Sequence, residues 1–188
     1  MCFSFEVSIS SFIISWSISL YLLRKKLSKE KKQAVILLMI FSTIQLFDTF
    51  LWYIKMEKNN INYIITSFFI PFVLCAQLFY NIIIINTFRD YLTILLLLIL
   101  SIYIFVKFNG YSVSLCENKL SSPIWGNNEI KLWEIIIFSI LVLYPNWKYI
   151  FIVSAIFFPI VYFYIGGSYG SLWCALGNWI AFKYLLLY

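Results

Sequence analysis

Residues 24–54 read RKKLSKEKKQAVILLMIFSTIQLFDTFLWYI, and this stretch decides the fold. It begins with a short connector that carries six basic residues and continues as a mainly apolar run from Ala34 to Ile54. A membrane-spanning helix needs about 20 such residues, and basic residues gather in the loops on the cytoplasmic side. The stretch therefore predicts a helix that crosses a membrane and starts on the cytoplasmic side.

The composition of the whole chain supports this interpretation. Of its 188 residues, 63% are hydrophobic, 21% are aromatic and only 12% are charged, whereas soluble domains carry about 25% charged residues. So few polar side chains cannot cover a soluble surface, which excludes a soluble enzyme and a nucleic-acid-binding module. The net charge of +6 comes largely from residues 24–32, so we expect a lipid bilayer as partner and no nucleic acid.

Seven segments have the length and apolar character of spanning helices. They cover about residues 5–23, 34–54, 61–85, 91–107, 131–146, 148–165 and 170–188. We therefore expect an all-α fold, in which residues 1–188 form a single transmembrane domain, a polytopic bundle of seven helices. With the basic connector inside, the N-terminus lies outside and the C-terminus is cytoplasmic. The longest outer loop, residues 108–130, is long enough to cap the outer mouth of the bundle.

Histidine is absent from the sequence, and none of its four cysteines forms a C-x-x-C pair. This excludes sites that need imidazole ligands, such as His-ligated iron, zinc and haem, so we expect no metal and no cofactor. Cys2, Cys116 and Cys174 all fall on the outer side of the expected bundle. A disulfide between two of them would form only if that side is oxidising.

The second span holds the strongest candidate for a functional site. Gln45, Asp48 and Trp52 are spaced i, i+3 and i+7, which places them on one helix face. Asp48 lies roughly 9 Å below the outer end of the helix at a rise of 1.5 Å per residue. A charge at the centre of a membrane costs about 2.5–3.5 kcal/mol. Such a carboxylate serves either a function or a buried hydrogen bond, for example to Gln45 or to a serine of the first helix.

Polar residues in other spans have a structural and a functional interpretation. Ser11, Ser15 and Ser19 are four residues apart, which predicts a close-packing helix face, with a polar lining for a solute path as the alternative. Gln77 and Asn81 share a face of the third span, which predicts hydrogen bonds between helices.

Two further carboxylates, Glu6 and Glu134, fall near the outer ends of the first and fifth spans. They are either solvated at the membrane interface or part of an outward-facing acidic vestibule that attracts cations.

Three stretches resemble an uncharacterised family of multi-pass membrane proteins from bacteria and large DNA viruses. Met1-Cys2-Phe3-Ser4 is similar to the start of that family, and Ser171-Leu172-Trp173-Cys174 to the S-x-W-C motif of its last helix. QLFDTFLW at residues 45–52 is similar to its Q-x-x-E-G-x-x-W pattern, with Asp48 in place of Glu and Thr49 in place of Gly. The resemblance implies a seven-helix bundle and no activity. Residues with A+T-rich codons favour a viral source, and hence a host-cell or virion membrane.

Most of these residues meet at one depth, which predicts a polar pocket at the outer end. The candidate pocket comprises Asp48, Gln45, Trp52, Cys2, Ser4, Trp173, Cys174, Glu6 and Glu134. We expect an integral membrane protein that is not an enzyme and that binds or passes a small solute or cation around Asp48. One alternative is a membrane enzyme that uses Cys2 or Cys174 with Asp48 as base. The other is a scaffold protein of a viral or host membrane. A homo-oligomer is compatible with each of them.

Overall fold

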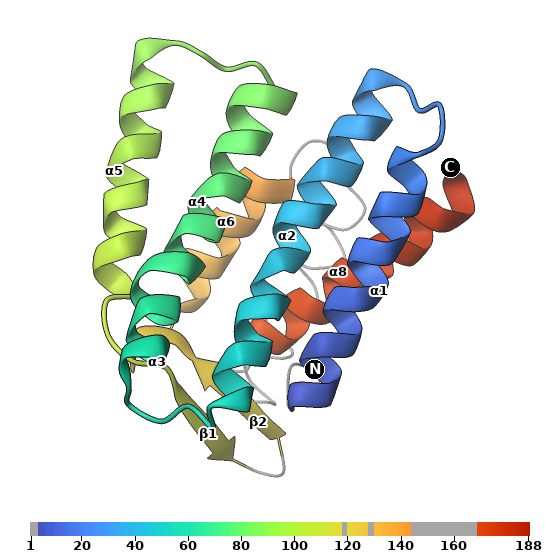
Figure 1. Cartoon of the computed structure of the whole chain (residues 1–188). Coiled ribbons are helices and arrows are strands. Elements are labelled where there is room, and N and C mark those ends of the chain that lie inside the picture. Colours follow the sequence, from blue (N-terminus) through green and yellow to red (C-terminus); the bar gives the residue numbers. More distant parts are fainter. Residues whose placement is uncertain (1–3, 118–119, 128–129, 144–168) are drawn as a thin grey trace.

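The computed structural model describes residues 4–117, 120–127, 130–143 and 169–188, and most of these are helical (Figure 1). The elements are, in chain order, α1 (Phe5–Leu23), α2 (Lys29–Tyr53), α3 (Asn60–Ile64), η1 (Ile65–Phe69), α4 (Ile70–Phe79), η2 (Tyr80–Ile85), α5 (Tyr91–Lys107), β1 (Val113–Glu117), β2 (Leu120–Ile124), η3 (Trp125–Asn127), α6 (Leu132–Leu143) and α8 (Tyr169–Leu187). The π-helical turns η1 and η2 join α3 and α4 into one helix from Asn60 to Ile85.

The helical prediction is confirmed for six of the seven expected segments, and the segment 148–165 lies outside the described residues. Within the described residues, three helices are long and apolar enough to cross a membrane: α1, α2 and the helix from Asn60 to Ile85. The all-α prediction is wrong in the connector 108–130, where β1 and β2 form an antiparallel hairpin with Val113 opposite Ile124. An apolar count does not detect so short a hairpin, because its apolar residues are mixed with Ser, Pro and Glu.

Polar side chains fix where the helices begin. The Ser28 hydroxyl accepts a hydrogen bond from the N–H of Lys31, so α2 starts at residue 29 and not at residue 34. Hydropathy marks where a helix becomes apolar, whereas the cap marks where its hydrogen bonds begin. Asp90 caps α5 at the expected place, through bonds from the hydroxyl (2.6 Å) and the N–H (2.9 Å) of Thr93. These two bonds hold the pKa of the Asp90 carboxyl below its ordinary value.

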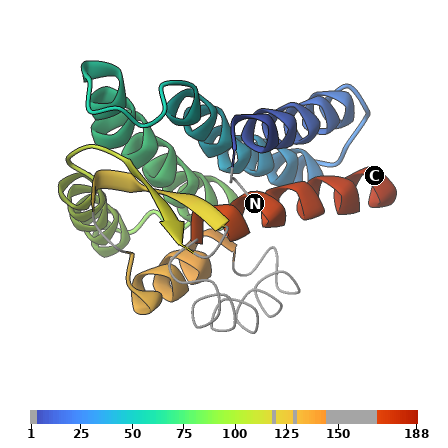
Figure 2. The same ribbon diagram turned by 90° about the horizontal axis from the view of Figure 1, so that it is seen from below.

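The helices form two groups that share α2 (Figures 1 and 2). On one side, α1 and α8 pack against α2 and against each other. On the other side, α4 packs against α2, and α5 and α6 pack against α4. Phe41, Ile44 and Leu51 of α2 are fully buried between the two groups. The central position of α2 means that the polar residues of its second half, such as Gln45 and Asp48, face protein.

The bundle has two chemically different ends (Figure 1). The β-hairpin lies at one end, together with the start of α1, and we call it the hairpin end. The α1–α2 connector with its six basic residues lies at the other, the basic end. Tyr188 at the C-terminus also lies there, because its carbonyl oxygen accepts a hydrogen bond from Lys25 and the ammonium of Lys31 lies 4.4 Å from its ring centroid. The two ends of the chain are therefore on opposite sides of the bundle.

Much of the outer surface of the bundle is apolar. Helix α5 buries only Leu97 and Ile104 fully, while Ile102 is 65% exposed and Val106 is 70% exposed. Large exposed apolar surfaces mark contacts with a membrane or with another protein.

Candidate functional site

The candidate site is a buried polar cluster on α2, near the hairpin end. Gln45 and Asp48 are 1% and 0% exposed, and Trp52, one turn further on, is half-buried against the core. The three residues therefore share a face that is turned into the protein, as their spacing predicts. Thr49 lies beside them and donates its hydroxyl proton to the carbonyl oxygen of Gln45.

The Asp48 carboxylate has a partner from the connector 108–130. The indole N–H of Trp125 donates a hydrogen bond of 2.9 Å to Asp48 Oδ1. Trp125 directly follows β2 and is only 5% exposed. Its ring meets that of Phe108 edge-on, with 5.9 Å between the centroids. The connector therefore covers the hairpin end of the bundle, as its length predicts, and contacts the carboxylate through Trp125. We call this connector the cap.

A glycine next to Trp125 makes this approach possible. Gly126 has φ of 71°, a conformation that side chains with a Cβ rarely adopt. A Cβ at this position would lie 2.8 Å from Cα of Phe108. The backbone of the cap therefore passes directly over the end of α5, which fixes the depth to which Trp125 reaches.

A second polar cluster fastens the chain just before the hairpin to the helix that starts at Asn60. The Asn62 amide is fully buried, donates to the carbonyl oxygen of Ser112 (2.9 Å) and accepts from its N–H (2.8 Å). The Thr66 hydroxyl donates to Asn62 Oδ1 and lies 2.6 Å from the Ser112 hydroxyl. Ser67 bonds both backbone groups of Gly110. The Asn62 side chain thus pairs with the cap as a neighbouring strand would.

Replacing Asn62 by Ala is expected to loosen the cap and to lower the free energy of unfolding by about 2 kcal/mol. The change leaves the buried N–H and carbonyl of Ser112 without partners, and each such group costs about 1–3 kcal/mol. Unfolding in mixed micelles measures the loss. The matched control is Asn60→Ala, since Asn60 is exposed two residues earlier. An equal effect of both substitutions would contradict the role given to Asn62.

The serine face of α1 is buried, which confirms the prediction of a packing face. Ser11, Ser15 and Ser19 are all below 7% exposed. Asn178 of α8 donates to the Ser11 hydroxyl (2.9 Å) and accepts from the Ser15 hydroxyl (2.8 Å). Ser19 bonds the carbonyl oxygen of Ser15. These hydroxyls hold α1 and α8 together, and the alternative of a solute path along them gains no support from these contacts.

Two polar atoms near the hairpin end have no hydrogen-bond partner among the described residues: Asp48 Oδ2 and the Ser8 hydroxyl, both buried. Their helices are neighbours, since α1 packs along α2 and the rings of Phe5 and Tyr53 lie 6.2 Å apart. Ser8 comes three residues after Phe5 in α1, and Asp48 comes five residues before Tyr53 in α2, so both lie on the same side of this aromatic pair. The two groups therefore lie within about one helical turn of each other in depth.

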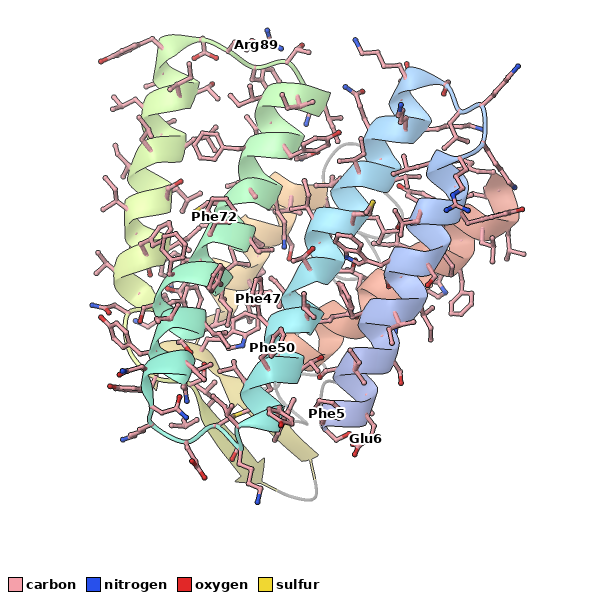
Figure 3. The ribbon with its side chains drawn as sticks, in the orientation of Figure 1. Phe5, Glu6, Phe47, Phe50, Phe72 and Arg89 are labelled. Carbon is pink, nitrogen blue, oxygen red and sulfur yellow. The ribbon has the colours of Figure 1, made fainter. Side chains whose placement is uncertain are left out.

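The structure does not bring every expected residue to Asp48. Ser4 caps α1, accepting from the N–H of Val7, and Glu6 is exposed on the surface of α1 at the hairpin end (Figure 3). Glu134 is bound elsewhere, in an ion pair of 2.5 Å with Lys107 of α5. The described carboxylates therefore do not form a common acidic vestibule.

The cysteine part of the expected pocket is not described in full. Cys2 lies outside the described residues, while Trp173 and Cys174 lie in the first turns of α8 without described side chains. The start of α8 contacts β2 at the hairpin end. Within the described residues, no three cysteines or carboxylates lie together as a metal site requires.

The prediction for the third span is confirmed for one residue of two. Asn81 donates a hydrogen bond of 2.7 Å to the carbonyl oxygen of Leu141 in α6, which joins these helices. Gln77 is fully buried, but neither atom of its amide has a hydrogen-bond partner in the described part of the chain.

Sequence reasoning missed three residues that build the site: Trp125, Asn62 and Asn178. The sequence Pro123-Ile124-Trp125-Gly126 is a signal for a turn that presents an indole N–H. Asn178 carried a weaker signal, a single amide within an apolar run, and Asn62 comes just after the polar connector that ends at Asn59 and Asn60.

Comparison with known proteins identifies no family for this chain. No protein-family model matches the chain, and no curated protein or solved structure is significantly similar to it. The resemblance of the three motifs therefore stays a prediction, and the function has to be argued from the site.

Proposed function

We propose that the chain is a multi-pass membrane protein with its hairpin end outside and its basic end in the cytoplasm. Three helices have the length and composition to span, and the exposed apolar residues of α5 suit contact with lipid. The six basic residues at one end follow the charge bias of cytoplasmic loops. The opposite placement of the two chain ends fits an odd number of crossings.

Within this bundle, the pocket around Asp48 binds or passes a small cationic solute. The proposal rests on one observation: Asp48 is fully buried in a helix long enough to span, and its Oδ2 has no hydrogen-bond partner in the described structure. Polar groups in such a setting are costly, which makes a functional role the default interpretation. A cation would supply the missing partner and balance the charge.

The geometry around Asp48 suits a ligand of small size. Trp125 holds one carboxylate oxygen, and the other remains for a ligand. The Ser8 hydroxyl at a similar depth offers a second oxygen.

The substitution Asp48→Asn tests whether Asp48 binds a cation or only stabilises the fold. The asparagine keeps an oxygen that accepts from Trp125 and has nearly the same volume, but it has no charge. We expect the variant to fold with unchanged thermal stability and to lose at least about tenfold in affinity for the cation. The assay is thermal stabilisation of the purified protein by Na⁺, K⁺ or methylammonium at constant ionic strength.

The control is Asp90→Asn, which removes a carboxylate at the exposed start of α5. It is expected to leave the response to the three cations unchanged. A full response in Asp48→Asn, or no response in the unmodified protein, would refute the cation pocket.

One observation favours a structural role instead. The hydrogen bond between Trp125 and Asp48 joins the cap to α2 across 77 residues of chain, as a scaffold protein would require. In that case Asp48→Asn behaves as the unmodified protein in every assay. Asp48→Leu, which removes the acceptor, then lowers stability without any effect on cations.

A further inference from the structure

A furrow runs along the outside of the bundle between α5 and α6. Both helices pack on α4, whereas they make few contacts with each other. Two hollows open along this line. One has a volume of about 110 Å³ and lies toward the hairpin end, and the other, of about 460 Å³, lies toward the basic end. Leu100 lines both hollows, so they lie next to each other along α5, and together we call them the furrow.

The furrow has apolar walls along its length and charged groups at one end. Leu100, Ile104 and Phe138 line the hairpin-end hollow, and Leu96 and Ile140 line the other. The charged groups of the hairpin-end hollow sit at its mouth, in the last turn of α5 and the first turn of α6. From this mouth to Leu96 is a distance of about 16 Å along α5. That is close to half of the roughly 30 Å hydrocarbon thickness of a bilayer, the depth that one acyl chain occupies.

The mouth of the furrow carries both signs of charge. Lys107 and Glu134 form an ion pair of 2.5 Å. Glu134 also accepts from the Tyr103 hydroxyl and from the N–H of Lys131. The pair has no net charge, so it matches a head group that itself carries one positive and one negative charge.

We propose that this furrow binds one acyl chain of a zwitterionic membrane phospholipid, with the head group over the Lys107–Glu134 pair. The assignment rests on the proposed membrane location and is independent of the Asp48 pocket. Trp133 is 53% exposed at the mouth, where its indole suits the level of lipid head groups.

Photolabelling tests this site in the intact protein. The chain is reconstituted into phosphatidylcholine vesicles that contain phosphatidylcholine with a photoreactive diazirine in its acyl chain. Labelled residues are then mapped by mass spectrometry. Ile102 lies on the same helix, faces outward and is 65% exposed, so its labelling measures contact with bulk lipid. We expect labelling at Leu100 and Phe138 to exceed that at Ile102 although both side chains are less exposed, because a bound acyl chain stays beside them while bulk lipid exchanges.

Two tryptophan substitutions provide the matched comparison. Leu100→Trp fills the furrow and is expected to reduce labelling of Phe138 about tenfold. Ile102→Trp adds the same side chain outside the furrow and is expected to leave that labelling unchanged. Equal circular dichroism spectra and melting temperatures verify that both variants fold. Uniform labelling around α5, or an equal loss in both variants, would overturn the proposal.

Two further arms separate the possible failures. If a photoreactive free fatty acid labels the furrow as strongly as the phospholipid, the zwitterionic occupant is wrong. Flotation of the vesicles reports membrane insertion by itself, so failure to float overturns the membrane location and the site with it. Asp48→Asn is expected to keep the labelling pattern, because the furrow does not depend on the carboxylate.

Discussion

Gly126→Ala is expected to displace the cap and to lower the free energy of unfolding by about 3 kcal/mol. A residue with a Cβ in the left-handed region costs about 1–2 kcal/mol. The new methyl group would also lie 2.8–3.0 Å from three backbone atoms of Phe108, which cannot move without shifting the end of α5. Trp125 would then lose its place against Asp48. Unfolding in mixed micelles and hydrogen exchange of residues 113–124 measure the two effects.

Gly177→Ala is the control for this substitution. Gly177 is helical, and its added Cβ would meet side-chain atoms of Phe41 and Gln45 at 3.2–3.3 Å. These atoms can shift by a few tenths of an ångström, and alanine gains about 1 kcal/mol in helix propensity. We expect a change within about 1 kcal/mol and an unaltered cap. If Gly126→Ala were equally mild, the close approach to Phe108 would not limit the position of the cap.

Trp125→Phe is expected to destabilise the protein by about 2–3 kcal/mol while leaving most of the packing in place. It removes one donor, and Asp48 is then buried with neither oxygen bonded to the described protein. Hydrogen bonds to charged groups contribute about 1.5–3 kcal/mol, and a buried group left without its partner adds a desolvation cost. The measurement is again the free energy of unfolding in mixed micelles.

A double-mutant cycle isolates this hydrogen bond. In an Asp48→Leu background the indole has no acceptor to lose, so Trp125→Phe is expected to cost less than about 1 kcal/mol. Trp179→Phe on the exposed side of α8 serves as a control for the ring itself. Equal costs of Trp125→Phe in both backgrounds would mean that the bond to Asp48 does not stabilise the cap.

Local patterns were sufficient to place most helices. The prediction of residues 91–107 matches α5 to the residue, because the apolar run begins where the helix begins and ends where it ends. The start of α2 was missed by five residues, since its first turn is charged and only its cap at Ser28 reveals it. The burial of Asp48 and of the α1 serines followed from helix spacing alone.

The partners of the site could not be predicted in the same way. Trp125 is 77 residues from Asp48, and Ser112 is 50 residues from Asn62. Periodicity assigns a face to a residue, but it does not say which distant segment covers that face. The sequence analysis placed Glu134 in the same pocket as Asp48 because both carboxylates fall toward the outer side of the expected bundle. In the structure, the ion pair with Lys107 holds Glu134 between α5 and α6 instead.

The distance in sequence between Asp48 and Trp125 has a consequence for biosynthesis. At about 5–20 residues per second, the ribosome makes Trp125 roughly 4–15 s after Asp48. In the proposed membrane protein, α2 would therefore carry its carboxylate before the indole exists. The apolar first half of the helix, from Ala34 to Ile44, would hold α2 in the bilayer during this interval, and the cap would cover the carboxylate afterwards.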